Sequence, residues 1–204
     1  MNIMLKETEK NEKHKWWRTG FFIFLKEMIA NPAAIGAACP STKQLARHLA
    51  GQVPLHYPGL IVELGGGTGA VTAALLEHAI PSENIIVIER SVALSVHLKS
   101  RFKQLRIIQG DASSLSALLG DDQHRVDAVV SSLPLKSLPE QTVKAIIQQT
   151  ASVLKPGGLF IYYTYDVRDP FSQILPGFTL IHSKLVWLNI PPARVMVCQR
   201  EHDQ

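Results

Sequence analysis

Three acidic residues stand where predicted strands end, and each could bind part of a nucleoside ligand. Glu63 lies in "VELGGGTGAVT" (62–72), Glu89 closes "NIIVIE" (84–89), and Asp111 follows "LRIIQ" in "GDA". A carboxylate at the first position would bind an ammonium group, since it faces the ligand crevice of such folds. Glu89 could accept hydrogen bonds from both hydroxyls of a ribose, and Asp111 could accept one from an adenine amino group. The three positions together favour a ligand site over three solvated charges.

The glycine loop that follows Glu63 leaves the type of nucleotide open. Gly65, Gly67 and Ala70 fit the G-x-G-x-x-G/A pattern, so a dinucleotide is allowed. A P-loop is excluded because the required lysine is absent. Glu63 would repel a pyrophosphate but attract a sulfonium cofactor that bears an amino-acid ammonium group. The loop therefore favours a cofactor without phosphate.

The elements that must position these residues alternate along the chain. Apolar runs of strand length occupy 60–64, 84–89, 105–109, 125–132 and 159–165, and helical patterns occupy 40–50, 69–79, 92–102 and 139–154. This alternation predicts right-handed βαβ units and a parallel sheet. In the helix over 69–79, the spacing predicts that Val71, Ala74, Leu75 and Ala79 face inward. The segment "KPGG" is predicted to separate the last helix from the fifth strand.

The end of the chain departs from this alternation. Strand-like stretches at 178–189 and 193–199 are separated by "IPP", which leaves no room for a helix. They predict an antiparallel hairpin at the edge of a mostly parallel α/β sheet. We expect one catalytic domain over 40–204, preceded by a polar tail and an aromatic and basic helix over 1–39.

Composition limits the partners and the compartment. The chain has 204 residues and a formal net charge of +4, with a pI near 9.1, which suits an anionic partner without identifying one. Cys39 and Cys198 lack metal-ligand spacing, so neither a disulfide framework nor a zinc site is expected. The apolar run "FFIFL" is too short to span a bilayer. A cytoplasmic protein is expected.

The ordered motifs resemble the class I S-adenosylmethionine-dependent methyltransferases. These motifs are E-x-G-x-G-x-G, an acid after the second strand, "GDA", "LKPGG" and the terminal hairpin. The resemblance implies a seven-stranded Rossmann-like fold, with S-adenosylmethionine as cofactor and S-adenosylhomocysteine as product. It also implies roles for the following residues: Glu63, Gly65, Gly66 and Gly67 at the methionine end, Glu89 at the ribose, Asp111 and Ala112 at the adenine, and Ser131 and Ser132 beside the methyl group.

Four segments resemble the small bacterial phospholipid N-methyltransferases more closely: "NPAAIGAACPS" (31–41), "SSLPL" (131–135), "YYTYD" (162–166) and "NIPPARV" (189–195). The resemblance implies stepwise methylation of phosphatidylethanolamine towards phosphatidylcholine. Gly66 departs from that family, which usually has proline there, and this puts the rigidity of the loop in doubt. In the related ribosomal RNA adenine dimethylases an Asn and an aromatic residue grip the base. Here Ser132 and Leu135 replace them, which disfavours a nucleic-acid substrate.

The chemistry implied is displacement at a sulfonium methyl group by a neutral amine, which needs positioning and desolvation but no metal. Tyr163, Tyr165 and Ser132 are the candidate catalytic residues, and Asp166 and His182 are further candidates for orienting the amine or relaying its proton. Tyrosine rings could also stabilise the methylated ammonium. Arg194 could pair with a lipid phosphate.

The N-terminal segment suggests where the protein works. A helix that places Trp16, Trp17 and Phe21 between basic residues suits a membrane interface. We expect a peripheral protein on the inner face of the cytoplasmic membrane, with phospholipid as its partner. Two alternatives stay open: an RNA or small-molecule methyltransferase of the same fold, and a cofactor-binding interaction protein without catalysis. The oligomeric state is not determined.

Overall fold

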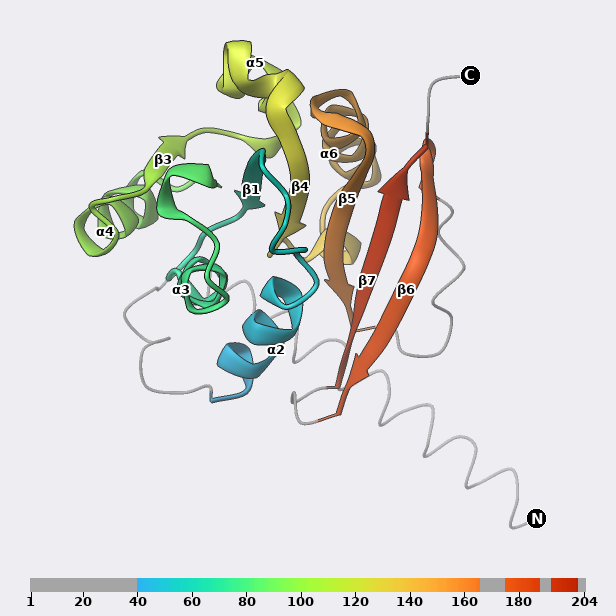
Figure 1. Cartoon of the computed structure of the whole chain (residues 1–204), viewed down its shortest axis with the longest axis horizontal. Coiled ribbons are helices and arrows are strands. Elements are labelled where there is room, and N and C mark those ends of the chain that lie inside the picture. Colours follow the sequence, from blue (N-terminus) through green and yellow to red (C-terminus); the bar gives the residue numbers. More distant parts are fainter. Residues whose placement is uncertain (1–39, 166–174, 188–191, 202–204) are drawn as a thin grey trace. The chain divides into compact units, whose positions relative to one another are not determined.

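The computed structural model describes residues 40–165, 175–187 and 192–201, all within one compact unit, Cys39–Gln204. Its centre is a seven-stranded sheet of order β3-β2-β1-β4-β5-β7-β6. The strands are β1 (Leu60–Leu64), β2 (Ile85–Glu89), β3 (Arg106–Gln109), β4 (Val126–Ser131), β5 (Leu154–Thr164), β6 (Phe178–Val186) and β7 (Ala193–Arg200). Figure 1 shows the sheet and its helices.

The predicted fold class is confirmed. The first five strands are mutually parallel, and β7 runs antiparallel to both of its neighbours, β5 and β6. This is the seven-stranded, mostly parallel, Rossmann-like α/β sheet with a C-terminal antiparallel hairpin. Because β1 lies between β2 and β4, the strand order reverses beside β1. Open α/β sheets bind their ligands at the carboxyl ends of the strands at such a point.

Helices cover the two faces of the sheet. Side chains of α2 (Pro40–Ala50), α3 (Ala70–Glu77) and α4 (Val92–Arg101) share one apolar core with alternate strand residues such as Ile61 and Val87. Side chains of α5 (Leu115–Leu119) and α6 (Glu140–Val153) share the second core with residues such as Val62. Successive strand residues point to opposite faces, so the continuous apolar runs of the strands fill both cores.

Three local predictions differ from the structure. Ala79 is not on the inward face of α3, because the helix ends at Glu77 and Ala79 is exposed with a φ of 65°. The segment "KPGG" is not a separator, since β5 begins at Leu154 and includes it. The short helix α5 was not predicted, because five residues are too few for a periodic pattern to show.

Candidate active site

The register of the sheet gathers the predicted cofactor residues at one edge. Glu63 is beside Val87 on β2 and Val130 on β4, and the next pair along β1 and β4 is Leu64 with Ser131. Glu89 pairs with Gln109 at the end of β3. The carboxyl ends of β1, β2, β3 and β4 therefore lie side by side, with Glu63 at the switch point.

Glu63 is fully buried and has one firm partner. Its carboxyl accepts a hydrogen bond of 2.6 Å from Thr72 Oγ1, which projects from the first turn of α3. Burial raises the pKa of Glu63 to about 8, while the hydrogen bonds from Thr72 act against that rise and nearby Glu89 adds to it. Without a cationic neighbour this carboxyl is therefore mostly protonated at neutral pH.

One oxygen of this carboxyl and a neighbouring serine hydroxyl, both buried, fit a cationic ligand group. Within the described part of the chain, Glu63 Oε1 and Ser132 Oγ are buried polar atoms that lack a well-formed hydrogen bond. The Ser132 hydroxyl is still near enough to Glu63 to lower the pKa of its carboxyl. Buried polar atoms are almost always bonded in native proteins, so a pair left over needs a partner. An ammonium group, as at the methionine end of S-adenosylmethionine, would supply both hydrogen bonds and the compensating charge.

The glycine loop turns sharply next to this pair. The N–H groups of Gly65 and Gly66 donate to the Ile88 carbonyl at 2.9 and 3.3 Å, and that of Gly67 donates to the Glu89 carboxylate at 2.9 Å. Gly65 and Gly67 have φ values of 76° and 53°, where glycine is favoured. A Cβ on Gly67 would meet only the Gly65 carbonyl, at 3.9 Å. The loop thus offers close approach to its backbone, while its N–H groups stabilise the fold.

Gly66 is required by packing. A Cβ at this position would lie 2.5 Å from Val87 Cγ1 and 2.8 Å from Leu98 Cδ1, and both of these side chains are fully buried. A proline would also remove the N–H that donates to Ile88. The close contacts with β2 and α4 therefore explain why this chain has glycine at position 66, where the resembling family usually has proline.

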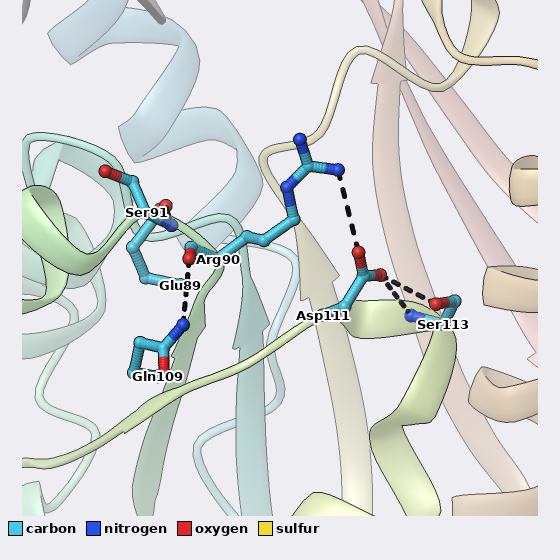
Figure 2. A network of polar contacts seen from close by, with 6 residues as sticks. All are labelled: Glu89, Arg90, Ser91, Gln109, Asp111 and Ser113. Atoms are coloured by element: carbon cyan, nitrogen blue, oxygen red, sulfur yellow. Dashed lines mark hydrogen bonds and ion pairs between the residues drawn. The ribbon is translucent and has the colours of Figure 1, made fainter.

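Glu89 and Asp111 are held by backbone N–H groups and by neighbours that the sequence reading missed (Figure 2). The second carboxylate oxygen of Glu89 accepts from Ser91 N–H at 2.7 Å, at the start of α4. Asp111 Oδ1 accepts from the N–H of Ser113 at 2.9 Å and from its hydroxyl at 2.7 Å. Asp111 Oδ2 lies 3.6 Å from the largely exposed guanidinium of Arg90.

These contacts keep Asp111 charged and in place. The Ser113 hydrogen bonds, more than Arg90, hold the pKa of Asp111 below its usual value. Asp111 also caps a short 3-10 turn, Ala112–Ser114, in which Ala112 is buried. Gln109 supports the arrangement by donating to the Arg90 carbonyl at 3.1 Å. The ionised carboxylate of Asp111 suits the polar edge of a base, and buried Ala112 suits its flat face.

The end of β4 brings the two predicted serines and one tyrosine together. Ser132 N–H donates to the Leu64 carbonyl at 2.9 Å, which continues the ladder between β1 and β4. Ser131 is fully buried, and its hydroxyl accepts from Leu133 N–H at 3.3 Å. The Tyr163 hydroxyl donates to the Ser132 carbonyl at 3.4 Å. Tyr163 is thereby held against the backbone of Ser132, whose own hydroxyl lies near the Glu63 carboxyl.

Tyr163 and Tyr165 form an aromatic pair on one face of the sheet. Their rings meet edge to face, with centroids 5.3 Å apart and an interplanar angle of 79°. Burial, together with the neighbouring Tyr165, raises the pKa of Tyr163 far above its ordinary value. The phenol therefore stays protonated at neutral pH and can donate or accept a hydrogen bond without losing its proton.

Arg194 is near these tyrosines in the sheet but faces away from them. It pairs with Thr164 across β5 and β7, and its guanidinium donates to Ser183 Oγ at 3.4 Å. Since alternate strand residues face opposite sides, Arg194 shares the face of Thr164 and not that of Tyr163 and Tyr165. The structure thus brings together the cofactor residues, Ser132 and the two tyrosines, and places Arg194 on the other face.

Some predictions fall on residues that are not described. Trp16, Trp17, Phe21 and Asp166 lie outside the described residues. Within residues 40–165, 175–187 and 192–201, no group of three or more His, Cys, Asp or Glu side chains could hold a metal ion. No helix in these same ranges is both long enough and apolar enough to cross a bilayer.

Sequence reasoning missed Thr72, Arg90, Ser91 and Ser113. A signal existed for Thr72, because it is the one hydroxyl in the otherwise apolar start "AVTAALL" of a predicted helix. Ser91 was also readable as a cap, since it directly precedes a predicted helix. Arg90 and Ser113 gave no periodic or motif signal.

Comparison with known proteins agrees with this geometry. The family described as methyltransferase domain matches residues 61–158. An ornithine lipid N-methyltransferase from Singulisphaera acidiphila is 32% identical over 188 residues, covering 88% of this chain and 95% of that protein. A ribosomal RNA small subunit methyltransferase C from Alcanivorax borkumensis is 28% identical over 131 residues, covering 59% of this chain but 38% of that protein.

Among solved structures, a Burkholderia thailandensis 1,6-didemethyltoxoflavin-N1-methyltransferase with bound S-adenosylhomocysteine has a TM-score of 0.66. The two chains are 15% identical, and the similarity covers 93% of this chain and 90% of that one. At this identity the likeness shows the fold alone.

Proposed function

Since this chain belongs to the class I S-adenosylmethionine-dependent methyltransferases, we propose that it methylates the amine of a membrane lipid. The observation that carries the proposal is the similarity to an ornithine lipid N-methyltransferase at 32% identity over nearly the whole length of that protein. The similarity extends well beyond the matched domain at 61–158, and so includes segments on both sides of the cofactor residues.

The cofactor has a site that suits it. When bound, S-adenosylmethionine supplies an electrophilic methyl group together with its own leaving group. Glu63 and Ser132 would hold its ammonium group, Glu89 its ribose, and Asp111 with Ala112 its adenine. The backbone of Gly65, Gly66 and Gly67 would lie against it, with the most open approach at Gly67, where a Cβ would meet only the Gly65 carbonyl.

The acceptor amine would lie against Ser132, Tyr163 and Tyr165. The Tyr163 hydroxyl stays protonated, so we assign it an orienting role and not that of a base. The paired rings exclude water and can stabilise the ammonium that forms on methylation. The proton lost by the amine before each transfer would pass to water or to Asp166.

The acceptor we propose first is phosphatidylethanolamine, methylated stepwise towards phosphatidylcholine. It is supported by the four segments at 31–41, 131–135, 162–166 and 189–195 that resemble the phospholipid enzymes. Ornithine lipid is the second candidate, favoured by the name of the similar protein. Both headgroups present an amine at the membrane surface. Trp16, Trp17 and Phe21 would bind that surface on the inner face of the cytoplasmic membrane.

The decisive experiment supplies methyl-labelled S-adenosylmethionine with each acceptor in turn. Vesicles with phosphatidylethanolamine, vesicles with ornithine lipid, vesicles of phosphatidylcholine alone and small ribosomal subunits are compared at equal enzyme concentration. We expect label in one of the amine lipids and none with phosphatidylcholine, and the Glu63→Ala variant as control should give none with any acceptor. Label in ribosomal RNA alone would refute the proposal. Cofactor binding without transfer to any acceptor would favour a non-catalytic interaction protein.

A further inference from the structure

The end of β6 carries a large apolar side chain that the chemistry described above does not use. Trp187 directly follows β6 and is 71% exposed, and Ile181 on the same strand is 51% exposed. The indole ring has an apolar body and a polar N–H, and such rings prefer the boundary between lipid and water. The question is what covers this end of the hairpin.

Trp187 is at the edge of the sheet where the site is. Val186, the last residue of β6, pairs with Ala193, and the next residue of β7, Arg194, pairs with Thr164 at the carboxyl end of β5. Figure 1 accordingly shows the end of β6 at the same end of the sheet as the arrowheads of β4 and β5. A surface docked here would face Ser132 and the tyrosine pair.

Three described segments around this end carry basic side chains and no carboxylates of their own. The segments Pro40–Ala50, Phe178–Val186 and Ala193–Arg200 contain lysine, arginine and histidine but neither aspartate nor glutamate. Exposed Lys184 is close enough to His48 to lower its pKa, although burial contributes more, so the basic end of the hairpin lies beside α2. Arg47 is paired with Glu77, which leaves exposed Lys43 and Lys184 as the principal cations. An anionic surface is the complementary partner.

The edge strand itself is unsuited to pairing with another strand. Its register shifts between Leu180 and His182, so Ile181 sits in an irregularity, and Lys184 follows within the same strand. Bulges and lysines on an edge strand prevent edge-to-edge pairing. This disfavours a second copy of the chain as the occupant.

We propose that Trp187 and Lys184, at the end of the β6–β7 hairpin, dock the catalytic domain on the surface of an anionic phospholipid bilayer. The inference rests on the proposed function, because a lipid acceptor has to reach the carboxyl edge of the sheet. Trp187 inserts at the headgroup level, and Lys184 lies over the lipid phosphates. The hairpin thereby orients the site towards the lipid amine, independently of the N-terminal segment.

Vesicle cosedimentation tests the docking directly. Vesicles of phosphatidylethanolamine and phosphatidylglycerol in equal parts are mixed with the full chain and with a Trp187→Ser variant. We expect the variant to bind about fivefold more weakly or worse. Val96→Ser is the matched control, because Val96 on α4 is a 60% exposed apolar residue elsewhere. Lys184→Gln should weaken binding and reduce its dependence on salt. Equal binding by Trp187→Ser and Val96→Ser overturns the proposal.

Two further measurements separate this proposal from its alternatives. The fluorescence of Trp187 is obtained as the difference between the full chain and a Trp187→Phe variant. Quenching of this fluorescence by iodide, without vesicles, shows whether the indole is accessible to solvent. An inaccessible indole would mean that another part of the chain covers it and would overturn the proposal. Methylation of vesicle lipid by Trp187→Ser should fall, while methylation of a short-chain monomeric lipid stays unchanged. If no lipid is methylated at all, the proposed function fails, and the binding data still decide the docking.

Discussion

Glu63 shows how one side chain couples burial, protonation and cofactor binding. It is fully enclosed at the end of β1, and its pKa rises from an ordinary value of 4.5 to about 8. A cationic ligand would reverse that shift, because the ionised carboxylate would then be paired. The same group should therefore make the stability of the cofactor-free protein depend on pH.

The first prediction concerns this pH dependence. The folded protein binds the Glu63 proton more tightly than the unfolded chain, so this group stabilises the fold below about pH 4.5 and loses that contribution as the pH rises to about 8. Glu63→Gln, which is neutral throughout, should remove a fall in unfolding free energy of roughly 4 kcal/mol across this window. Denaturant unfolding of both proteins at several pH values measures the difference. If the free energies of unfolding of the two proteins changed in parallel with pH, Glu63 would not be buried in its protonated form.

The second prediction concerns Gly66. Gly66→Pro should lower the free energy of unfolding by about 2–4 kcal/mol, because the ring would overlap Val87 and Leu98 and the hydrogen bond to Ile88 would be lost. Gly66→Ala should cost less, since it keeps the N–H. Combining Gly66→Ala with Val87→Ala should be less damaging than the sum of the single effects. Strict additivity would show that the clash with Val87 is not the cause.

At the scale of elements, α3 connects the glycine loop to the sheet. The helix begins after Gly69 and presents Val71, Ala74 and Leu75 to the core, together with Thr72. Thr72 is thereby aimed at Glu63 on β1, nine residues earlier in the chain. A rotation of the helix by one residue would place Val71 or Ala73 there, so the helix orientation determines whether the carboxyl is held.

The third prediction tests this role of Thr72 in positioning Glu63. Thr72→Val preserves the shape but removes the hydrogen bond, so cofactor affinity should fall about tenfold or more. Because the Thr72 hydrogen bond lowers the pKa of Glu63, the pH at which affinity rises should also move upward. Calorimetric titration with S-adenosylhomocysteine over a pH series measures both effects. Thr72→Ser keeps the hydroxyl, so it should restore the original affinity and pH profile. A drop in affinity without any shift in the pH profile would indicate general damage to packing.

At the scale of the whole molecule, the site depends on contributions from four strand ends. Glu63, Glu89, Asp111 and Ser132 come from segments up to 69 positions apart in the numbering, and the sheet alone brings them to one edge. A ligand that spans these positions should therefore stabilise the domain as a unit.

The fourth prediction is that the bound cofactor product stabilises the folded domain. S-adenosylhomocysteine at about 100 times its dissociation constant should raise the free energy of unfolding by about 2.7 kcal/mol, and the melting temperature by about 5–10 °C. Removing metal ions with a chelator should leave this shift unchanged. Glu63→Ala should abolish the shift at the same ligand concentration. A shift that persists in Glu63→Ala would show that the ammonium end of the cofactor is held elsewhere.

The sequence by itself determined the parallel sheet, the hairpin and the positions of Glu63, Glu89 and Asp111 at strand ends. Those features follow from local periodicity and from short motifs, because alternating strands and helices admit few arrangements and place ligand-binding residues at one edge. The class of cofactor followed from the same residues, since a carboxylate before a glycine loop discriminates against a pyrophosphate.

Only the tertiary structure decided which side chains meet. The hydrogen bond from Thr72 to Glu63, the link between Tyr163 and Ser132, the packing that requires Gly66 and the face occupied by Arg194 all depend on helix rotation and on register between strands distant in the chain. Local patterns carry little information about these quantities, because they are set by how the two cores pack together.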